Sequence, residues 1–308
     1  MTLTELRYIV AVARLHHFGK AARTCFVSQP TLSVAVKKLE EELNVTLFER
    51  RKADVTVTPE GERIVEVAQQ MLEQAETIRQ IARQEQDVLA SPLRLGLIYT
   101  IGPYLTPHLL PLLQRQAPQM TLQITEDFTD NLSEALKRGE LDVIVLSLPF
   151  DKPGIETEPL YDEPFMLALP AGHHLARRKQ VSMEVLRDDT LLLLGAGNCF
   201  RDQVLEVCPG CAPGQASHNN MQKTLEGSSL ETIRQMVATG AGVTVLPSTS
   251  TGPGTDLSGL LTFRPFQRPI PKRRVALAYR KSFPRREAVQ VLHQAISNCP
   301  LESVQMLA

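Results

Sequence analysis

The chain has 308 residues, a net charge of −1 and five cysteines, and 43% of its residues are hydrophobic against 22% charged. This length allows two or three domains, and the composition excludes a disordered chain or a small disulfide scaffold. No apolar run approaches the roughly 18 residues that cross a membrane, and Glu5, Arg7 and Arg14 interrupt the N-terminus where a signal peptide needs an apolar core, so we expect a cytoplasmic protein with reduced thiols.

The charges are unevenly distributed along the chain. Residues 1–58 hold nine Lys and Arg against six Asp and Glu, a net charge of +3, and the remainder holds 24 against 28, a net charge of −4. A basic head on an acidic body indicates a nucleic-acid-binding end.

The head has the pattern of a helix-turn-helix. A first helix is expected over Thr4–Val12, a second ending near Cys25, and a third from Gln29, with Ser28 as its N-cap and Pro30 in its first turn. We expect the apolar residues of this third helix to face inward; they are Val34, Ala35 and Leu39. The polar residues on its other faces suit base edges and phosphates; they are Gln29, Thr31, Ser33, Lys37 and Lys38. A helical hairpin with a merely polar outer face is the alternative.

A basic turn follows the helices. Arg50, Arg51 and Lys52 precede the alternating pair Val55 and Val57, which predicts a small hairpin and hence a winged variant of the motif. These cations would meet the phosphate backbone or form a solvated loop.

A long helix is predicted next. Thr58 caps it with Pro59 at its first position, and apolar residues repeat at helical spacing from Ile64 to Ala82 before Ser91-Pro92 ends it. A single apolar stripe of this length needs a partner helix or a face of its own body.

From Leu93 onward, strands alternate with helices, which predicts a doubly wound α/β body. The expected strands are Leu93–Tyr99, Leu122–Thr125, Leu141–Leu148, Leu160–Leu169, Leu191–Leu194, Gly242–Leu246, Leu260–Phe263 and Val275–Tyr279. The expected helices are Pro103–Gln116, Thr129–Arg138 and one that opens with a capping box at Ser228–Glu231. Ligands of such folds bind at strand carboxyl ends, where Thr100 and Thr129 lie. Both residues could instead serve only turns or caps.

One thiol stands at an unusual place in this body. A buried strand, Leu191–Leu194, and a glycine turn precede a helix that opens near Cys199. Unpaired backbone N–H groups and the helix dipole stabilise a thiolate there, and Arg201 adds a cation two residues on. The turn lacks the third glycine of a dinucleotide fingerprint, because Phe200 stands in that place, so we expect no cofactor.

Cys208 makes this thiol a possible switch. In a helix, Cys199 and Cys208 would lie roughly 13 Å apart along the axis and on opposite faces, whereas a disulfide needs α-carbons within about 7 Å. A bond between them would require the helix to unwind and would couple oxidation to shape. The alternative is that Cys199 is simply a small buried hydrophobe.

The head resembles the N-terminal domain of LysR-type transcriptional regulators. The resemblance lies in the stretch FGKAARTCFVSQPTLSVAVKKLEEELNVTLFER, followed by VTVTPEGE. It implies a winged helix-turn-helix over 1–58, a dimerisation helix over 59–90 and a regulatory domain over 91–308 that resembles periplasmic binding proteins. Subdomain I would cover about 91–161 and 268–308, and subdomain II about 162–267. By resemblance, the DNA-binding residues are Ser28, Gln29, Pro30, Thr31, Ser33, Lys37 and Arg50.

The body is similar to the OxyR-type peroxide sensors of that family, through YTIGPYLTPHLLPLL, LYDEPFMLALP, CFRDQVLEVC and SSLETIRQMVATGAGVTVLP. The resemblance implies that hydrogen peroxide oxidises Cys199 to a sulfenic acid, which Cys208 resolves to a disulfide. It further implies a peroxide pocket of Thr100, Thr129, Asn198, Arg201 and Asp202. It also implies operator DNA and RNA polymerase as partners and a dimer or tetramer that acts as an activator.

Two residues depart from the pattern of that group. Asn198 stands where many members carry His, so that proton transfer must use Thr, water or backbone groups. Cys208-Pro-Gly-Cys211 forms an additional C-x-x-C, which could form a local disulfide, compete for resolution or bind metal with His218. We expect no metal, because this ligand set is incomplete.

Three functions compete on the sequence alone. The first is a peroxide-sensing transcription factor. The second is a LysR-type regulator of a small organic effector, with incidental cysteines. The third is a thiol peroxidase, which the helix-turn-helix head argues against, so we expect no enzyme.

Overall fold

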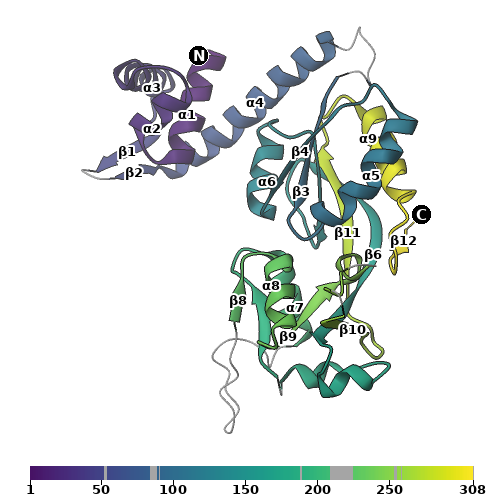
Figure 1. Cartoon of the computed structure of the whole chain (residues 1–308). Coiled ribbons are helices and arrows are strands. Elements are labelled where there is room, and N and C mark those ends of the chain that lie inside the picture. Colours follow the sequence, from purple (N-terminus) through teal and green to yellow (C-terminus); the bar gives the residue numbers. More distant parts are fainter. Residues whose placement is uncertain are drawn as a thin grey trace. The chain divides into compact units, whose positions relative to one another are not determined.

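A computed structural model describes residues 1–51, 54–83, 89, 91–187, 189–208, 225–252, 255–257 and 259–307. The chain divides into two compact units, Met1–Glu85 and Gln86–Ala308 (Figure 1). Among the described residues, the two units share no core: the first has one hydrophobic core and the second has two.

The N-terminal unit is a winged helix-turn-helix, as predicted. Its elements are α1 Leu3–Leu15, α2 Phe18–Thr24, α3 Gln29–Leu43, β1 Phe48–Arg51, β2 Asp54–Val57 and α4 Pro59–Arg83. The Ser28 hydroxyl caps α3 by accepting the Thr31 N–H, and Pro30 lies in the first turn. The strands β1 and β2 pair antiparallel to form the wing.

The inward face of α3 differs from the predicted one. Leu32, Val36 and Leu39 are fully buried in the core of the unit, whereas Val34 is 68% exposed. The prediction that Val34 faces inward was therefore wrong. The helix is rotated so that the 32–36–39 stripe packs, because those three branched side chains fill the space against α1 and α2.

The helix α4 has one face packed on the core of its own unit and one exposed apolar face. Thr58 accepts the Gly61 N–H and so caps the helix as predicted. Ala68 is buried in the core of the head, while Val67, Met71 and Ile78 remain exposed along the helix. The predicted apolar stripe is therefore divided between the helix's own unit and a free face.

The second unit is built on one ten-stranded sheet, with strand order β4-β3-β5-β11-β6-β9-β7-β8 and with β10 and β12 added to β6. The strands are β3 Leu93–Ile98, β4 Leu122–Asp127, β5 Val143–Leu148, β6 Ile155–Pro170, β7 Leu191–Leu194, β8 Leu225–Gly227, β9 Val243–Pro247, β10 Leu261–Pro265, β11 Lys272–Arg280 and β12 Gln305–Met306. The α-helices are α5 Gly102–Gln116, α6 Thr129–Lys137, α7 Cys199–Val207, α8 Leu230–Ala238 and α9 Arg286–Ser297. Short 3-10 helices cover His174–Arg177, Met183–Arg187 and Ser248–Thr251.

Two hydrophobic cores divide this unit into subdomains. One packs α5, α6 and α9 around the parallel strands β3, β4 and β5, and the other packs α7 and α8 on β7 and β9. The long antiparallel strands β6 and β11 run between the two subdomains (Figure 1). The two-subdomain α/β fold is thus confirmed, and β6 begins earlier than predicted, at Ile155.

One predicted cap is wrong by a residue. Ser229, not Ser228, caps α8 by accepting the Thr232 N–H. Glu231 does not close a capping box, because its carboxylate binds Tyr104 and Arg234 instead.

Within the described part of the chain, no helix combines the length and apolarity that a membrane crossing requires.

Candidate functional site

The helix α7 carries both cysteines of the predicted switch. It begins at Cys199, after the strand β7 and a turn in which Gly197 has φ +90°, and ends at the C-cap Cys208. Cys199 is half-buried and packs against the core of subdomain I, whereas Cys208 is buried in the core of subdomain II. The two cysteines therefore lie on opposite sides of the helix, about 13 Å apart along its axis.

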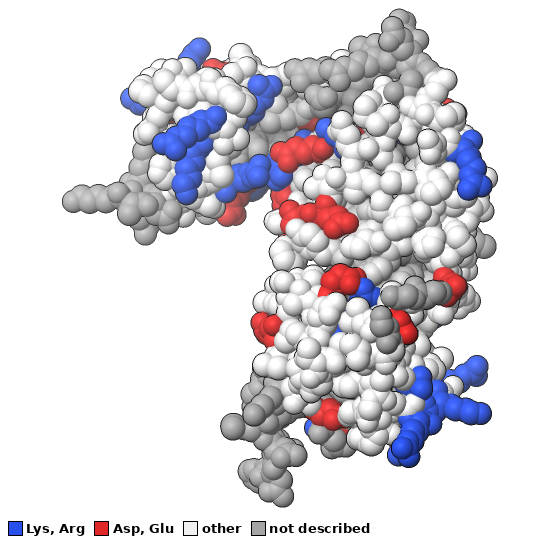
Figure 2. Space-filling model, in the orientation of Figure 1, with Lys and Arg blue, Asp and Glu red and all other residues white. Residues whose placement is uncertain are grey.

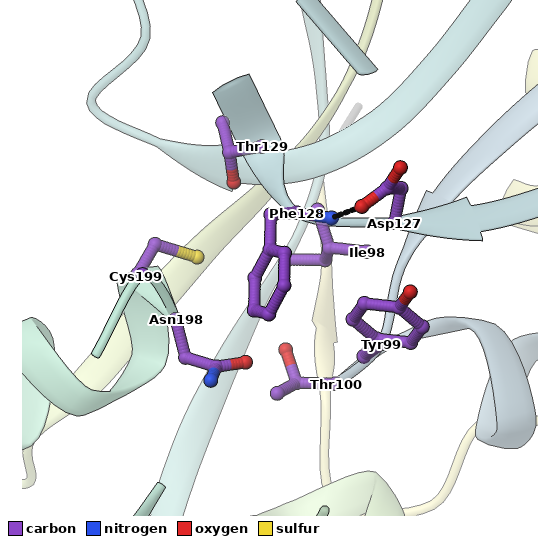
Figure 3. A pocket seen from close by; sticks show the side chains of 9 residues that line it. Ile98, Tyr99, Thr100, Asp127, Phe128, Thr129, Asn198 and Cys199 are labelled. Atoms are coloured by element: carbon purple, nitrogen blue, oxygen red, sulfur yellow. Dashed lines mark hydrogen bonds between the residues drawn. The ribbon is translucent and has the colours of Figure 1, made fainter. Parts of the chain in front are cut away.

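Three segments bring their ends together around the Cys199 thiol (Figure 3). They are the end of β3, the start of α6 and the start of α7, and the pocket residues are Ile98, Tyr99, Thr100, Asp127, Phe128, Thr129, Gly197, Asn198 and Cys199. The cavity volume is about 10 Å³. A cavity of that size holds about one water-sized molecule, so the pocket suits a very small ligand.

The Thr100 hydroxyl is held by a buried ion pair. Arg273 donates from Nη1 to Thr100 Oγ1 at 2.7 Å and from Nη2 to the Thr100 carbonyl at 2.9 Å. The same guanidinium donates from Nε to Glu163 at 2.7 Å, and both charged side chains are completely buried. Because Thr100 Oγ1 already accepts a hydrogen bond, its own proton is available to a ligand in the pocket.

Thr129 supplies a second hydroxyl to the pocket. Its Oγ1 atom is buried and has no hydrogen-bond partner among the described residues. Figure 3 shows this hydroxyl and the Cys199 thiol pointing into the same space. An unsatisfied buried hydroxyl costs stability, so Thr129 is a candidate donor to a molecule in the pocket.

Replacing Thr129 by valine should separate this role from stability. Thr129→Val keeps the shape and removes the unpaired hydroxyl, so we expect unchanged or slightly higher thermal stability. The rate at which Cys199 reacts with hydrogen peroxide should fall by about a hundredfold, the usual cost of losing one positioned donor. Ser133→Ala is the matched control, because Ser133 Oγ is also buried and unpartnered but does not line the pocket. Equal reaction rates for Thr129→Val and Ser133→Ala would contradict this assignment.

Asn198 lies at the N-cap of α7. Its Nδ2 donates to the Gly195 carbonyl at 2.9 Å, and Figure 3 shows its amide oxygen on the pocket side. The amide oxygen of Asn198 can accept a hydrogen bond in the pocket, whereas a histidine at this position could also gain or lose a proton.

The structure does not bring Arg201 and Asp202 to the pocket. Arg201 donates from Nη1 to the Leu194 carbonyl at 2.9 Å and to Glu226 at 2.5 Å, and Asp202 is exposed. The cation expected beside the thiol is thus paired with an acid on the neighbouring strand β8.

Sequence reasoning missed the residues that hold α7 in place. Gln203 donates from Nε2 to Ser147 Oγ at 2.8 Å, across to subdomain I. The Phe200 ring lies under the Arg273 guanidinium at 5.2 Å. The sequence offered only a weak signal for the buried Glu163–Arg273 pair, since Glu163 follows Asp162 and Arg273 lies between two other cations, Lys272 and Arg274.

The remaining cysteines differ in state. Cys208 is disulfide-bonded, while Cys199, Cys25 and Cys299 are free, so Cys199 and Cys208 are not joined to each other. Burial raises the pKa of Cys25, and it raises the pKa of Cys299 to about 11. Cys211 and His218 lie outside the described residues, and the described ones include no cluster of three or more metal-ligating side chains.

Five of the seven predicted DNA-binding residues lie at the N-cap and in the first turns of α3, while Lys37 lies further along the helix and Arg50 lies in β1. Gln29, Pro30, Thr31 and Lys37 are exposed, and Ser33 is half-buried. The Ser28 hydroxyl is occupied by its capping bond and by a 2.7 Å contact to Thr31 Oγ1. The Arg50 side chain lies outside the described part of the structure. Figure 2 shows Lys and Arg side chains on the face of this unit that it presents.

A winged helix-turn-helix joined to a two-subdomain α/β unit defines a class, the DNA-binding transcription regulators. Residues 3–62 match the bacterial regulatory helix-turn-helix protein family of the lysR type, and residues 86–299 match the LysR substrate binding domain. The chain is 37% identical over 296 residues to the DNA-binding transcriptional dual regulator OxyR of Escherichia coli K12, covering 96% of this chain and 95% of that protein. The chain therefore belongs to the LysR family, in its OxyR-type branch.

Solved structures agree with this assignment. A full-length OxyR from Pseudomonas aeruginosa, with one cysteine replaced by aspartate, is 50% identical, with a TM-score of 0.76 over 100% of this chain and 99% of that one. A cysteine-to-serine mutant of Corynebacterium glutamicum OxyR, in an H2O2-bound form, is 33% identical, with a TM-score of 0.63 over 96% and 91% of the two chains.

Proposed function

We propose that this chain is a hydrogen-peroxide-responsive transcription regulator in which Cys199 is the reacting thiol. The observation that carries the proposal is the pocket itself, in which a free thiol at a helix N-terminus meets an unpartnered hydroxyl in a space for one very small molecule. The relatives' names, which include hydrogen peroxide-inducible genes activator, support the same ligand.

In the proposed reaction, the Cys199 thiolate attacks one peroxide oxygen and the O–O bond breaks. Sulfur is oxidised to a sulfenic acid, and the leaving hydroxide takes up a proton to become water. Thr100 and Thr129 donate hydrogen bonds to the two oxygens, and the amide oxygen of Asn198 accepts one from the peroxide.

Resolution by Cys208 would then change the fold locally. The Cys208 thiolate attacks the sulfenic sulfur, a disulfide forms, and the hydroxide that leaves takes up a proton to become water. Because the two cysteines lie at opposite ends and on opposite sides of α7, the helix must unwind, and the Gln203–Ser147 contact to subdomain I breaks with it. This step requires Cys208 as a free thiolate.

The output of the proposed switch is altered DNA binding. The free apolar face of α4, with Val67, Met71 and Ile78 exposed, supports a homodimer through this helix. We propose that dimers assemble into tetramers on operator DNA, that α3 and the wing with Arg50 contact the duplex, and that the oxidised form activates RNA polymerase.

The organic-effector regulator is the second candidate on the sequence. The relatives' names favour the first candidate over it, because they refer to hydrogen peroxide and not to an organic effector. A peroxidase differs from a sensor by continuous turnover with a reductant, which we do not expect.

Disulfide mapping by mass spectrometry tests the proposal. The protein is fully reduced, treated at pH 8 with near-stoichiometric hydrogen peroxide, alkylated and digested. We expect a Cys199–Cys208 bond, whereas Cys299, with a pKa of about 11, has a thiolate fraction of about one thousandth and stays reduced. A bond confined to Cys208 and Cys211, with a sulfenic acid at Cys199, would keep Cys199 as the reacting thiol and reject only its resolution by Cys208. Failure of Cys199 to oxidise selectively would reject the proposal.

A further inference from the structure

The exposed face of the recognition helix carries an apolar side chain at its centre. Val34 is 68% exposed, and among the described residues of α3 it is the one large hydrophobic side chain with this exposure. The core face of the same helix is complete without it, since Leu32, Val36 and Leu39 are fully buried. The core of the unit therefore does not use the Val34 side chain, which is available to a partner of this helix face.

The neighbours of Val34 place it on the surface that faces DNA. Pro30 and Thr31 lie one turn before it and Lys37 and Lys38 one turn after it, at the spacing of one helix face, and all four are exposed. The lysines suit phosphates, and the first turns of a recognition helix contact base edges. The Thr31 hydroxyl is engaged with Ser28 at 2.7 Å, which leaves Val34 as the central side chain of this face.

The chemistry of the major groove then limits what Val34 can recognise. Valine has no hydrogen-bonding side-chain atom, and the 5-methyl group of thymine is the apolar group that base pairs present in that groove. We infer that Val34 contacts the 5-methyl group of one thymine in each half-site and contributes to operator specificity. This inference rests on the proposed DNA-binding role of α3.

Exchange of thymine for deoxyuridine tests this contact, because it removes only the methyl group. Duplexes that the full-length reduced protein selects from a random library are resynthesised with each thymine replaced singly by deoxyuridine. For the unaltered protein, we expect one thymine per half-site whose replacement weakens binding by about threefold to tenfold, the effect of removing one buried methyl group. Val34→Ala should weaken binding to the thymine duplex similarly and show no further loss with deoxyuridine at that position.

Two variants guard against indirect effects. Val34→Thr keeps one methyl group in the same shape and should retain part of the discrimination. Ile270→Ala removes apolar atoms from another exposed residue, in the regulatory unit, and should bind like the unaltered protein. Because Val34 is exposed, circular dichroism and the affinity for a random duplex should be unchanged in Val34→Ala.

The possible failures can be told apart. One outcome is that selection yields a duplex that the protein binds specifically. If each deoxyuridine replacement then weakens binding equally for Val34→Ala and for the unaltered protein, the Val34 contact is rejected and the DNA-binding proposal stands. If no sequence is enriched by selection, both are rejected.

Discussion

Replacing Cys199 by serine is expected to slow the formation of sulfenic acid in the protein by hydrogen peroxide by at least about a thousandfold, the scale of removing a nucleophile. A hydroxyl in this position is not ionised at neutral pH, so it cannot attack the O–O bond. The pocket should remain intact, because the Cys199 thiol is free and contributes mainly packing. The measurement is the rate of sulfenic acid formation, together with operator binding before and after a peroxide pulse.

Variants of the other cysteine positions provide the comparison. Cys208→Ser should form the sulfenic acid at an unchanged rate but keep the α7 helix and the reduced pattern of operator binding. Cys211→Ser tests the C-x-x-C alternative and should leave the Cys199–Cys208 bond intact. A peroxide response that survives Cys199→Ser would show that the reacting group is elsewhere.

Breaking the buried ion pair should have the largest effect on stability. Glu163→Gln removes the carboxylate that compensates Arg273, and both side chains are completely buried. Loss of one partner of such a pair costs about 3–5 kcal/mol, which lowers the melting temperature of a domain of this size by about 6–20 °C. Because Arg273 also holds Thr100, the reaction of Cys199 with peroxide should slow as well.

The next residue along β11 offers a matched control. Arg274 pairs with Asp162 at 2.7 Å, but its side chain is 48% exposed, so Arg274→Gln should cost less than about 1 kcal/mol. Thermal or urea unfolding of both variants measures the difference. If Glu163→Gln and Arg274→Gln lowered the free energy of unfolding by similar amounts, burial would not determine how much the Glu163–Arg273 pair contributes to stability.

Local patterns determined much of the architecture. The winged helix-turn-helix follows from helical periodicity, the Ser28 cap and the alternation of Val55 and Val57. The strand–turn–helix around Cys199 follows from four leucines and a glycine that adopts a positive φ. These features depend on residues within a few positions of one another, which is why the sequence alone predicts them.

Rotation of a helix and choice of partner depend on distant residues. Spacing alone did not show that α3 packs through Leu32, Val36 and Leu39 and leaves Val34 in solvent, because two overlapping stripes were available and only the shape of the core selects one. In the same way, Arg201 pairs with Glu226 on β8 rather than with the thiol.

For the chemistry, the sequence by itself determined which thiol we propose to react, its position at a helix start and the two hydroxyl residues to test. Only the tertiary structure decided how they meet. The sheet aligns the ends of β3, α6 and α7, and the crossing strands β6 and β11 bring Glu163 and Arg273 together beneath Thr100. The physical reason is that a pocket and a buried charge pair are made of long-range contacts, whose energies depend on burial and geometry that no local pattern encodes.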